Sequence, residues 1–223
     1  MFHVKHKEFC LFKKIILNET NSEEYYDIQN IIHSMAQESI TSLNLIIESL
    51  EMRDFDSIKM IDTIKEELND NQIMIDSLFY NLLSGTHKID INTIWQYVYI
   101  ASVYEHIGCV CISISKHIKQ IINYIDNVNK EILDIILFLK RIHNLLSLLS
   151  KSFFTKRIDF FLNVNDELFI LTKFKDSIVN SIINCMKGDQ GLFPFYTELI
   201  FIVTGVFQIG TYSIEIYNRI NYV

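Results

Sequence analysis

Residues 91–126 read INTIWQYVYIASVYEHIGCVCISISKHIKQIINYID, and this stretch decides the fold class. Its apolar face follows spacings of mainly three and four residues, along Ile94, Val98, Ala101, Tyr104, Gly108, Cys111, Ile118, Ile122 and Ile125. That spacing is typical of one face of an α-helix. The stretch therefore predicts one long helix with a continuous buried face. Gly108, on that face, predicts the close approach of a neighbouring helix.

The same periodicity extends on both sides and predicts six helices in all. Their approximate ranges are 22–52, 54–84, 91–126, 130–153, 159–187 and 195–221. Residues that favour helix ends lie at the expected places: Ser22, Asp54 and Asp90 suit N-caps, and Gly85 suits a C-terminal stop. Pro194 lies at the start of the last range, where proline is tolerated.

The overall composition supports long helices around a large core. The 223 residues are 49% hydrophobic, with one proline and six glycines. This is too apolar for a disordered chain and too poor in turn-forming residues for a sandwich or barrel of short strands. Isoleucine occurs 39 times and alanine twice, and β-branched residues lean towards strands. Because many isoleucines fall three, four or seven residues apart, we assign them to helix packing.

The chain contains two similar halves. Ile107–Gly108 recurs as Ile209–Gly210 after 102 residues, and Glu66–Leu68 resembles Asp166–Leu168 at an offset of 100. This indicates an internal duplication. We therefore expect an N-terminal extension over 1–21, a first antiparallel three-helix bundle over 22–126 and a second over 127–223.

The net charge of −7 argues against nucleic-acid binding, which requires a basic face. Four cysteines, Cys10, Cys109, Cys111 and Cys185, have no disulfide or metal-site spacing and are interpreted as buried reduced thiols. The most apolar stretch, Leu199–Ile209, has about 11 residues, whereas a membrane-spanning helix needs about 20. We expect a cytoplasmic protein with at most peripheral membrane association through its partners.

Motifs for enzyme chemistry are missing from the sequence. It has no Gly-rich phosphate loop, no G-x-S-x-G, no H-E-x-x-H and no Glu-x-x-His pair of the di-iron bundles. The acid pairs Glu23/Asp27 and Glu66/Asp70 fit a solvated helix face better than acid–base catalysis. We therefore expect no catalytic residues.

One cluster carries possible chemistry: Glu105, His106, Cys109 and Cys111. Glu105 and Cys109 are four residues apart and share a helix face, where a carboxylate and a thiolate could bind a soft or borderline metal. The alternative is an acid and a buried thiol that flank a packing glycine. The residues alone leave both open.

Several short motifs resemble, in order, those of the PhoU family of phosphate-signalling regulators. The run Tyr104–Cys109 resembles the family signature L-E-R-I-G-D, and Phe207–Tyr212 lies where that signature repeats. Further similar segments are Met52–Asp54 for the family's R-D, Asp90–Asn92 for its D-L-R, and the closing Ile214–Val223. The resemblance covers about Ser22 to Val223.

The resemblance implies an all-α pair of tandem three-helix bundles, usually dimeric and not an enzyme. It implies an adaptor between the phosphate ABC transporter ATPase and a sensor histidine kinase. It also implies iron or zinc bound through E/D-x-x-x-D pairs, but here only Glu105 keeps its acid. Cys109 replaces one aspartate, and Phe207 and Thr211 replace both acids of the second half. We therefore expect no cofactor or a weakly bound metal at Glu105 and Cys109, and weak or no metal binding in the second half.

Two other functions compete with this one. A divergent helical protein could bind a partner helix without a role in phosphate signalling, and the missing acids count against a metal-dependent enzyme. Two superposable three-helix halves favour the regulator, whereas one bundle around a central helix favours the helix-binding protein.

Overall fold

The structure is a computed structural model that describes residues 23–53, 56–84, 90–121, 124, 130–155 and 164–220. Within these ranges the chain is helical and forms no β-strand. The elements are α2 (Glu23–Met52), α3 (Asp56–Ser84), α4 (Ile91–Ile121), α5 (Lys130–Thr155), α6 (Val164–Gly188), the short 3-10 helix η2 (Gln190–Leu192) and α7 (Phe193–Ile220). The expected all-α class is confirmed.

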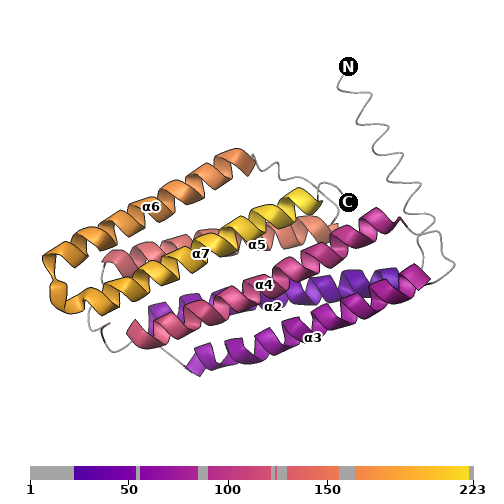
Figure 1. Cartoon of the computed structure of the whole chain (residues 1–223), viewed down its shortest axis with the longest axis horizontal. Coiled ribbons are helices and arrows are strands. Elements are labelled where there is room, and N and C mark those ends of the chain that lie inside the picture. The colour runs from indigo at the N-terminus through magenta and orange to yellow at the C-terminus, as the bar shows by residue number, and fades with distance from the viewer. Residues whose placement is uncertain are drawn as a thin grey trace, which may run out of the picture.

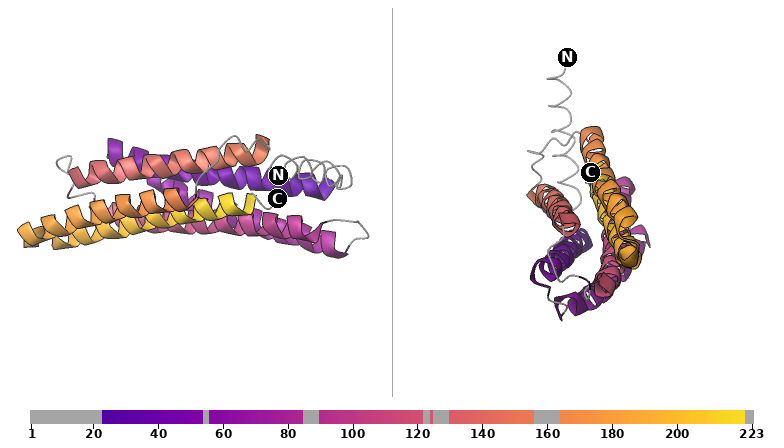
Figure 2. Two further views of the ribbon diagram at one scale, coloured as in Figure 1. Left: turned by 90° about the horizontal axis from the view of Figure 1, so that it is seen from above. Right: turned by 90° about the vertical axis from the view of Figure 1, so that its left-hand side faces the viewer.

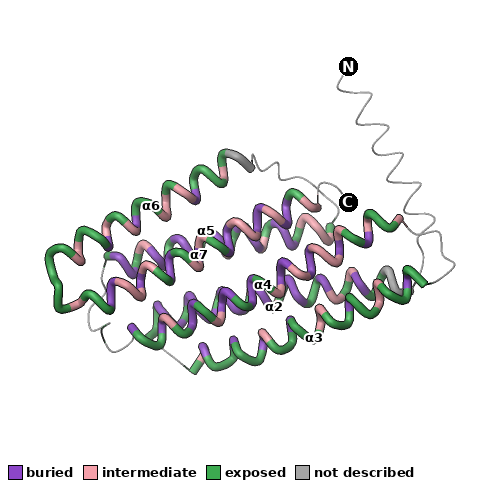
Figure 3. The backbone as a smooth tube through the Cα atoms, viewed as in Figure 1, coloured by how far each residue is buried: buried purple, intermediate pink, exposed green. Residues whose placement is uncertain are grey.

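The six long helices lie in two layers (Figures 1 and 2). Helices α3, α4, α7 and α6 lie side by side in that order and form a curved layer, while α2 and α5 cover its concave side. Figure 3 shows the exposed backbone mainly on α3 and α6, at the edges of the layer. The two central helices, α4 and α7, are therefore the ones that join the halves of the molecule.

The helices form two three-helix bundles, as expected. Helices α2, α3 and α4 contact one another, as do α5, α6 and α7. The bundles meet along α4 and α7, and again along α2 and α5. We call the α4–α7 contact the seam. The expected pair of three-helix bundles is confirmed.

Residues of the seam repeat with the duplication. At one end, the His117 ring stacks on Phe201 at 4.9 Å between centroids, and His117 Nδ1 lies 2.5 Å from Glu198 Oε2. The residues 102 positions from these three, Arg219, Tyr99 and Gln96, meet at the other end. Arg219 lies 4.1 Å above the Tyr99 ring and donates to Gln96 Oε1 at 3.3 Å. Helices α4 and α7 are therefore antiparallel and related by an approximate two-fold axis.

The predicted apolar faces form the core. In α3 the buried residues are Ile58, Ile61, Ile64, Leu68, Ile75 and Leu82, which are spaced mainly three, four or seven residues apart. Phe79, which falls on the same spacing, is only partly buried. Each full burial contributes roughly 1.5–3 kcal/mol relative to an exposed side chain. The isoleucine excess thus serves helix packing.

The starts of α4 and α7 agree with the sequence, whereas the end of α4 does not. Asp90 caps α4, because its carboxylate accepts from the Asn92 backbone N–H at 3.0 Å and from the Thr93 hydroxyl at 2.8 Å. Pro194 is the second residue of α7, which begins at Phe193. Helix α4 ends at Ile121, five residues before the expected end.

Several expectations lie outside the described residues. These are the caps at Ser22 and Asp54, the stop at Gly85, the extension over 1–21, and residues 159–163 of the fifth helix. The boundary expected between 126 and 127 lies there too.

The repeat differs in register from the sequence comparison at one place. Leu68 is fully buried, but Leu168, its expected counterpart, is 39% exposed. Leu171 is fully buried and takes the equivalent position against Gly210. The sequence comparison aligned Leu168 with Leu68 because both follow an acidic pair. Leu171 lies three residues further on, nearly one helical turn, and it is the residue that packs where Leu68 packs in the first half.

Two segments are long and apolar enough, by length and composition, to cross a membrane: Ile91–Ile121 and Gln190–Ile220. The expectation that the apolar stretch near Leu199 is too short was therefore wrong, because it counted only part of α7. Buried core helices pass the same test, and both segments contribute to the core.

Candidate functional site

Glu105 lies on α4 and is held by a lysine from α3. Lys65 Nζ lies 2.5 Å from Glu105 Oε1, and both side chains are mostly buried, at 16% and 19% exposure. Cys109, one turn along α4, donates its thiol to the same oxygen at 3.4 Å. The expected pair of Glu105 and Cys109 therefore does share a face, but a third residue, Lys65, completes the group.

Gly108 makes this arrangement possible. A Cβ at Gly108 would lie 2.5 Å from Leu68 Cδ1 and 3.1 Å from Lys65 Cδ. The aliphatic part of Lys65 thus crosses α4 where the side chain is missing, and its ammonium reaches Glu105. The interpretation of Gly108 as a close-approach residue is confirmed.

The charges at this site are settled by these contacts. Burial alone would raise the pKa of Glu105, but the hydrogen bonds from Lys65 and Cys109 outweigh it and leave that pKa below its ordinary value. Burial, followed by the nearby Glu105 carboxylate, raises the pKa of Cys109. The pair at neutral pH is therefore an ionised carboxylate and a neutral thiol.

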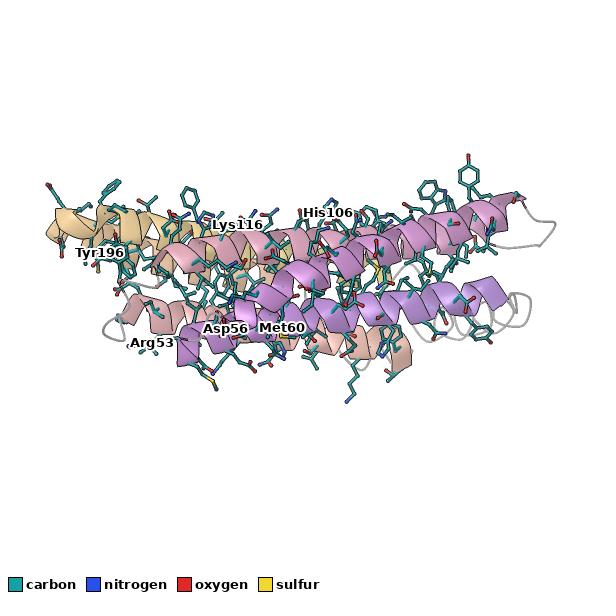
Figure 4. All side chains as sticks on the ribbon, turned by 90° about the horizontal axis from the view of Figure 1, so that it is seen from below. Arg53, Asp56, Met60, His106, Lys116 and Tyr196 are labelled. Carbon is teal, nitrogen blue, oxygen red and sulfur yellow. The ribbon has the colours of Figure 1, made fainter. Side chains whose placement is uncertain are left out.

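Of the other two members of the expected cluster, His106 borders Glu105 at the surface and Cys111 lies in the core. His106 stacks on Tyr212 of α7 at 5.9 Å, and its Nε2 is 3.9 Å from Glu105 Oε2. Figure 4 labels His106 on the four-helix layer, away from the Arg53 end of α2. Cys111 is fully buried, and burial raises its pKa to about 12. The four residues of the expected cluster therefore do not point into one common site.

The thiols are only partly as expected. Cys111 is buried and Cys185 is half-buried, but Cys109 is exposed. Its position beside Gly108 is as expected, and its burial was wrong, because it lies on the rim of the α3–α4 contact. Cys10 lies outside the described residues.

The second half places different chemistry at the matching positions. Lys175 Nζ of α6 lies 4.7 Å above the Phe207 ring, and the Thr211 hydroxyl donates to the Gln208 carbonyl at 2.7 Å. Gly210 again faces a close neighbour, since a Cβ there would lie 2.7 Å from Ile142 Cδ1. The packing glycine is thus repeated, while the acids are not.

An iron or zinc ion does not fit the residues present at Glu105. Such an ion needs three or four donors, with thiols ionised. The site instead offers one carboxylate already bound to an ammonium, and a thiol held neutral. Among the residues that the structure describes, no three His, Cys, Asp or Glu side chains are grouped so as to hold a metal.

Lys65 was missed by sequence reasoning. It lies 40 residues from Glu105 and on another helix, so no short-range spacing joins them. Of the acid pairs expected on solvated faces, Glu66 and Asp70 are exposed, as is Asp27. The side chain of Glu23 lies outside the described residues.

A groove runs along the seam on the outer face of the four-helix layer. It has a volume of about 390 Å³ and is lined by His106, Cys109 and His117 of α4 and by Phe201, Gln208 and Tyr212 of α7, among others. Gly205 forms part of its floor, where a Cβ would lie 2.8 Å from Ile114 Cγ1. The Glu105 site and the seam therefore share one edge of α4.

The fold defines a class: an elongated protein of two antiparallel three-helix bundles joined along their last helices. A family model described as the PhoU domain matches residues 32–118. This range includes Glu105 and Cys109 but not the second half. No curated protein matches the chain.

Two solved structures share the fold. PhoU from Pseudomonas aeruginosa has a TM-score of 0.83 at 14% sequence identity, over 89% of this chain and 96% of that one. The phosphate transport system regulatory protein PhoU from Streptococcus pneumoniae has a TM-score of 0.76 at 16% identity, over 88% and 93%. The PhoU resemblance is confirmed: residues 32–118 match a PhoU domain, and the chain has the PhoU fold.

Proposed function

We propose that this protein is a non-enzymatic regulator of phosphate uptake and of phosphate-responsive signalling. The observation that carries the proposal is the PhoU-domain match over 32–118, within a chain whose fold resembles two PhoU structures over most of its length. One of those is described as a phosphate transport system regulatory protein. The duplicated bundles add support, because they favour the regulator over a helix-binding protein built as one bundle around a central helix.

The proposed mechanism is binding. The protein acts as a cytoplasmic adaptor, as a homodimer, between the ATPase subunit of a phosphate ABC transporter and a sensor histidine kinase. Its long helices, about 46 Å for the 31 residues of α4, provide extended faces for such partners. A helical face recognises another protein through anchors three and four residues apart.

The test is a pull-down of the full-length protein from its native cells grown with abundant phosphate. We expect recovery of the phosphate transporter ATPase, and a rise in phosphate uptake when the gene is inactivated. Recovery under phosphate starvation is the comparison. Loss of the gene without any change in uptake would contradict the proposal.

A second function is favoured by one surface. Leu133 and Leu137 of α5, 48% and 56% exposed, border an apolar groove of about 430 Å³ next to the end of α2. Such a groove suits the apolar face of a partner helix. If a partner helix binds in this groove, replacing Leu137 by Asp should abolish recovery of that partner protein in a pull-down from the same cells. The matched control is Leu148→Asp, further along α5 and 42% exposed.

A further inference from the structure

A lysine ammonium group from a neighbouring helix lies against each of α4 and α7, at matching positions. Lys65 reaches Glu105 of α4, and Lys175 lies above Phe207 of α7, 102 residues later. The two lysines come from different places on α3 and α6, so the duplication alone does not bring them there. What the two halves share is a positive charge next to the first position of the acid motif.

The Lys65 ammonium forms a salt bridge with Glu105. At 2.5 Å the ammonium and the carboxylate are in direct contact, and both side chains are mostly shielded from water. The aliphatic part of Lys65 is fixed at Gly108, because its Cδ lies 3.1 Å from where a Cβ would be. The close approach at Gly108 therefore brings the Lys65 side chain to Glu105.

A divalent cation at Glu105 would have to share the carboxylate with this ammonium. Like charges at contact distance repel strongly in a partly desolvated site. The second carboxylate oxygen, Glu105 Oε2, lies 3.9 Å from the His106 ring nitrogen Nε2, so the imidazole borders that side of the carboxylate. Cys109 adds a thiol hydrogen to the same carboxylate oxygen.

We propose that Lys65 is a built-in cation that occupies the place of a metal ion at the first-half acid motif. Glu105 is thereby neutralised by the protein itself, and this face of α4 keeps its charge balance at any metal concentration. The proposal concerns the residues of this chain and does not depend on which partners it binds.

The experiment measures metal retention and metal-dependent thermal stability in the full-length protein. Each variant is incubated with zinc or iron(II), desalted and analysed for metal, and its Tm is recorded with and without the ion. The key variant is Lys65→Met/Cys109→Asp, which empties the cation position and supplies a second carboxylate one turn from Glu105. Two controls keep Lys65: Cys109→Asp alone, and Lys59→Met/Cys109→Asp, which removes an exposed lysine of the same helix.

We expect the wild type and both controls to retain no stoichiometric metal and to show no Tm shift. Lys65→Met/Cys109→Asp supplies two carboxylates, which are too few to hold metal through desalting, but its Tm should rise by at least about 2 °C when excess zinc is present. Circular dichroism of each variant without metal establishes that it is folded.

Three results would overturn the proposal. They are stoichiometric metal on the wild type, an equal response from Cys109→Asp while Lys65 is present, and no response from the folded Lys65→Met/Cys109→Asp protein.

Discussion

Glu105 is a charged side chain that is held within a helix contact by two donors. Its carboxylate accepts from a lysine on one helix and from a thiol on its own. Because both donors meet the same oxygen in a shielded site, the carboxylate stays ionised and its charge is balanced locally. The acid is thus part of the α3–α4 contact.

Replacing Lys65 by Met should lower the free energy of unfolding at pH 7 by about 1–3 kcal/mol, because a mostly buried carboxylate loses its charged partner. The folded pKa of Glu105 lies below its ordinary value of 4.5. Its stabilisation is therefore present above that value and is lost as the pH falls through the lower, folded pKa. The difference between wild type and variant should shrink accordingly, as measured by urea denaturation at pH 7, 5 and 3.

The control for this prediction is Lys59→Met, which removes the exposed ion pair with Asp56 on the same helix. Exposed pairs contribute little to stability. An equally large loss in Lys59→Met would contradict the role given to the buried pair.

Replacing Gly108 by Ala should cost stability although alanine favours helices by about 1 kcal/mol. The new Cβ would contact Leu68 and Lys65 too closely, and overpacking typically costs about 1–3 kcal/mol. Gly188→Ala is the matched control, because nothing lies within 4 Å of a Cβ there. In thermal denaturation the Tm of Gly108→Ala should be lower than the Tm of Gly188→Ala. The reverse order would show that a methyl group fits beside Gly108 without strain.

At the scale of the helices, the sequence predicts the faces well and the partners poorly. The stripe from Ile58 to Leu82 follows from spacing alone, because helix periodicity is local. The contact of Lys65 with Glu105 depends on how far α3 slides along α4, and no local pattern encodes that shift. The same limit explains why Leu168 was matched to Leu68 when Leu171 holds the position.

The corrected register makes a direct prediction. Leu171→Ala should destabilise the protein by about 2–5 kcal/mol, the usual cost of truncating a fully buried leucine. Leu168→Ala, at 39% exposure, should cost much less. Chemical denaturation of the two variants compares them, and similar losses would restore the register suggested by composition.

At the scale of the whole molecule, the seam and the α2–α5 contact tie the bundles together. Lys140 of α5 pairs with Glu51 of α2 at 2.6 Å, across the same boundary. Two repeats joined along two pairs of long helices share one core, so neither half has a separate interior.

The two bundles should therefore unfold together. The single tryptophan, Trp95, packs against Phe79 with 5.0 Å between the ring centroids and reports on the α3–α4 contact, whereas far-UV circular dichroism reports on all helices. The urea midpoints of the two signals should coincide. Separate midpoints would mean that the first bundle unfolds on its own.

The approximate two-fold axis of the seam has one more consequence. Equivalent residues of α4 and α7 face each other around it, as in the isologous interface of a symmetric dimer. Each half presents to the other nearly the surface that it would present to a copy of itself. A chain with such an internal symmetry can close the interface within one molecule or exchange halves with a neighbour. The architecture is that of two once-identical subunits whose surfaces have since diverged: His117 and Glu198 mark one end, Arg219 and Gln96 the other.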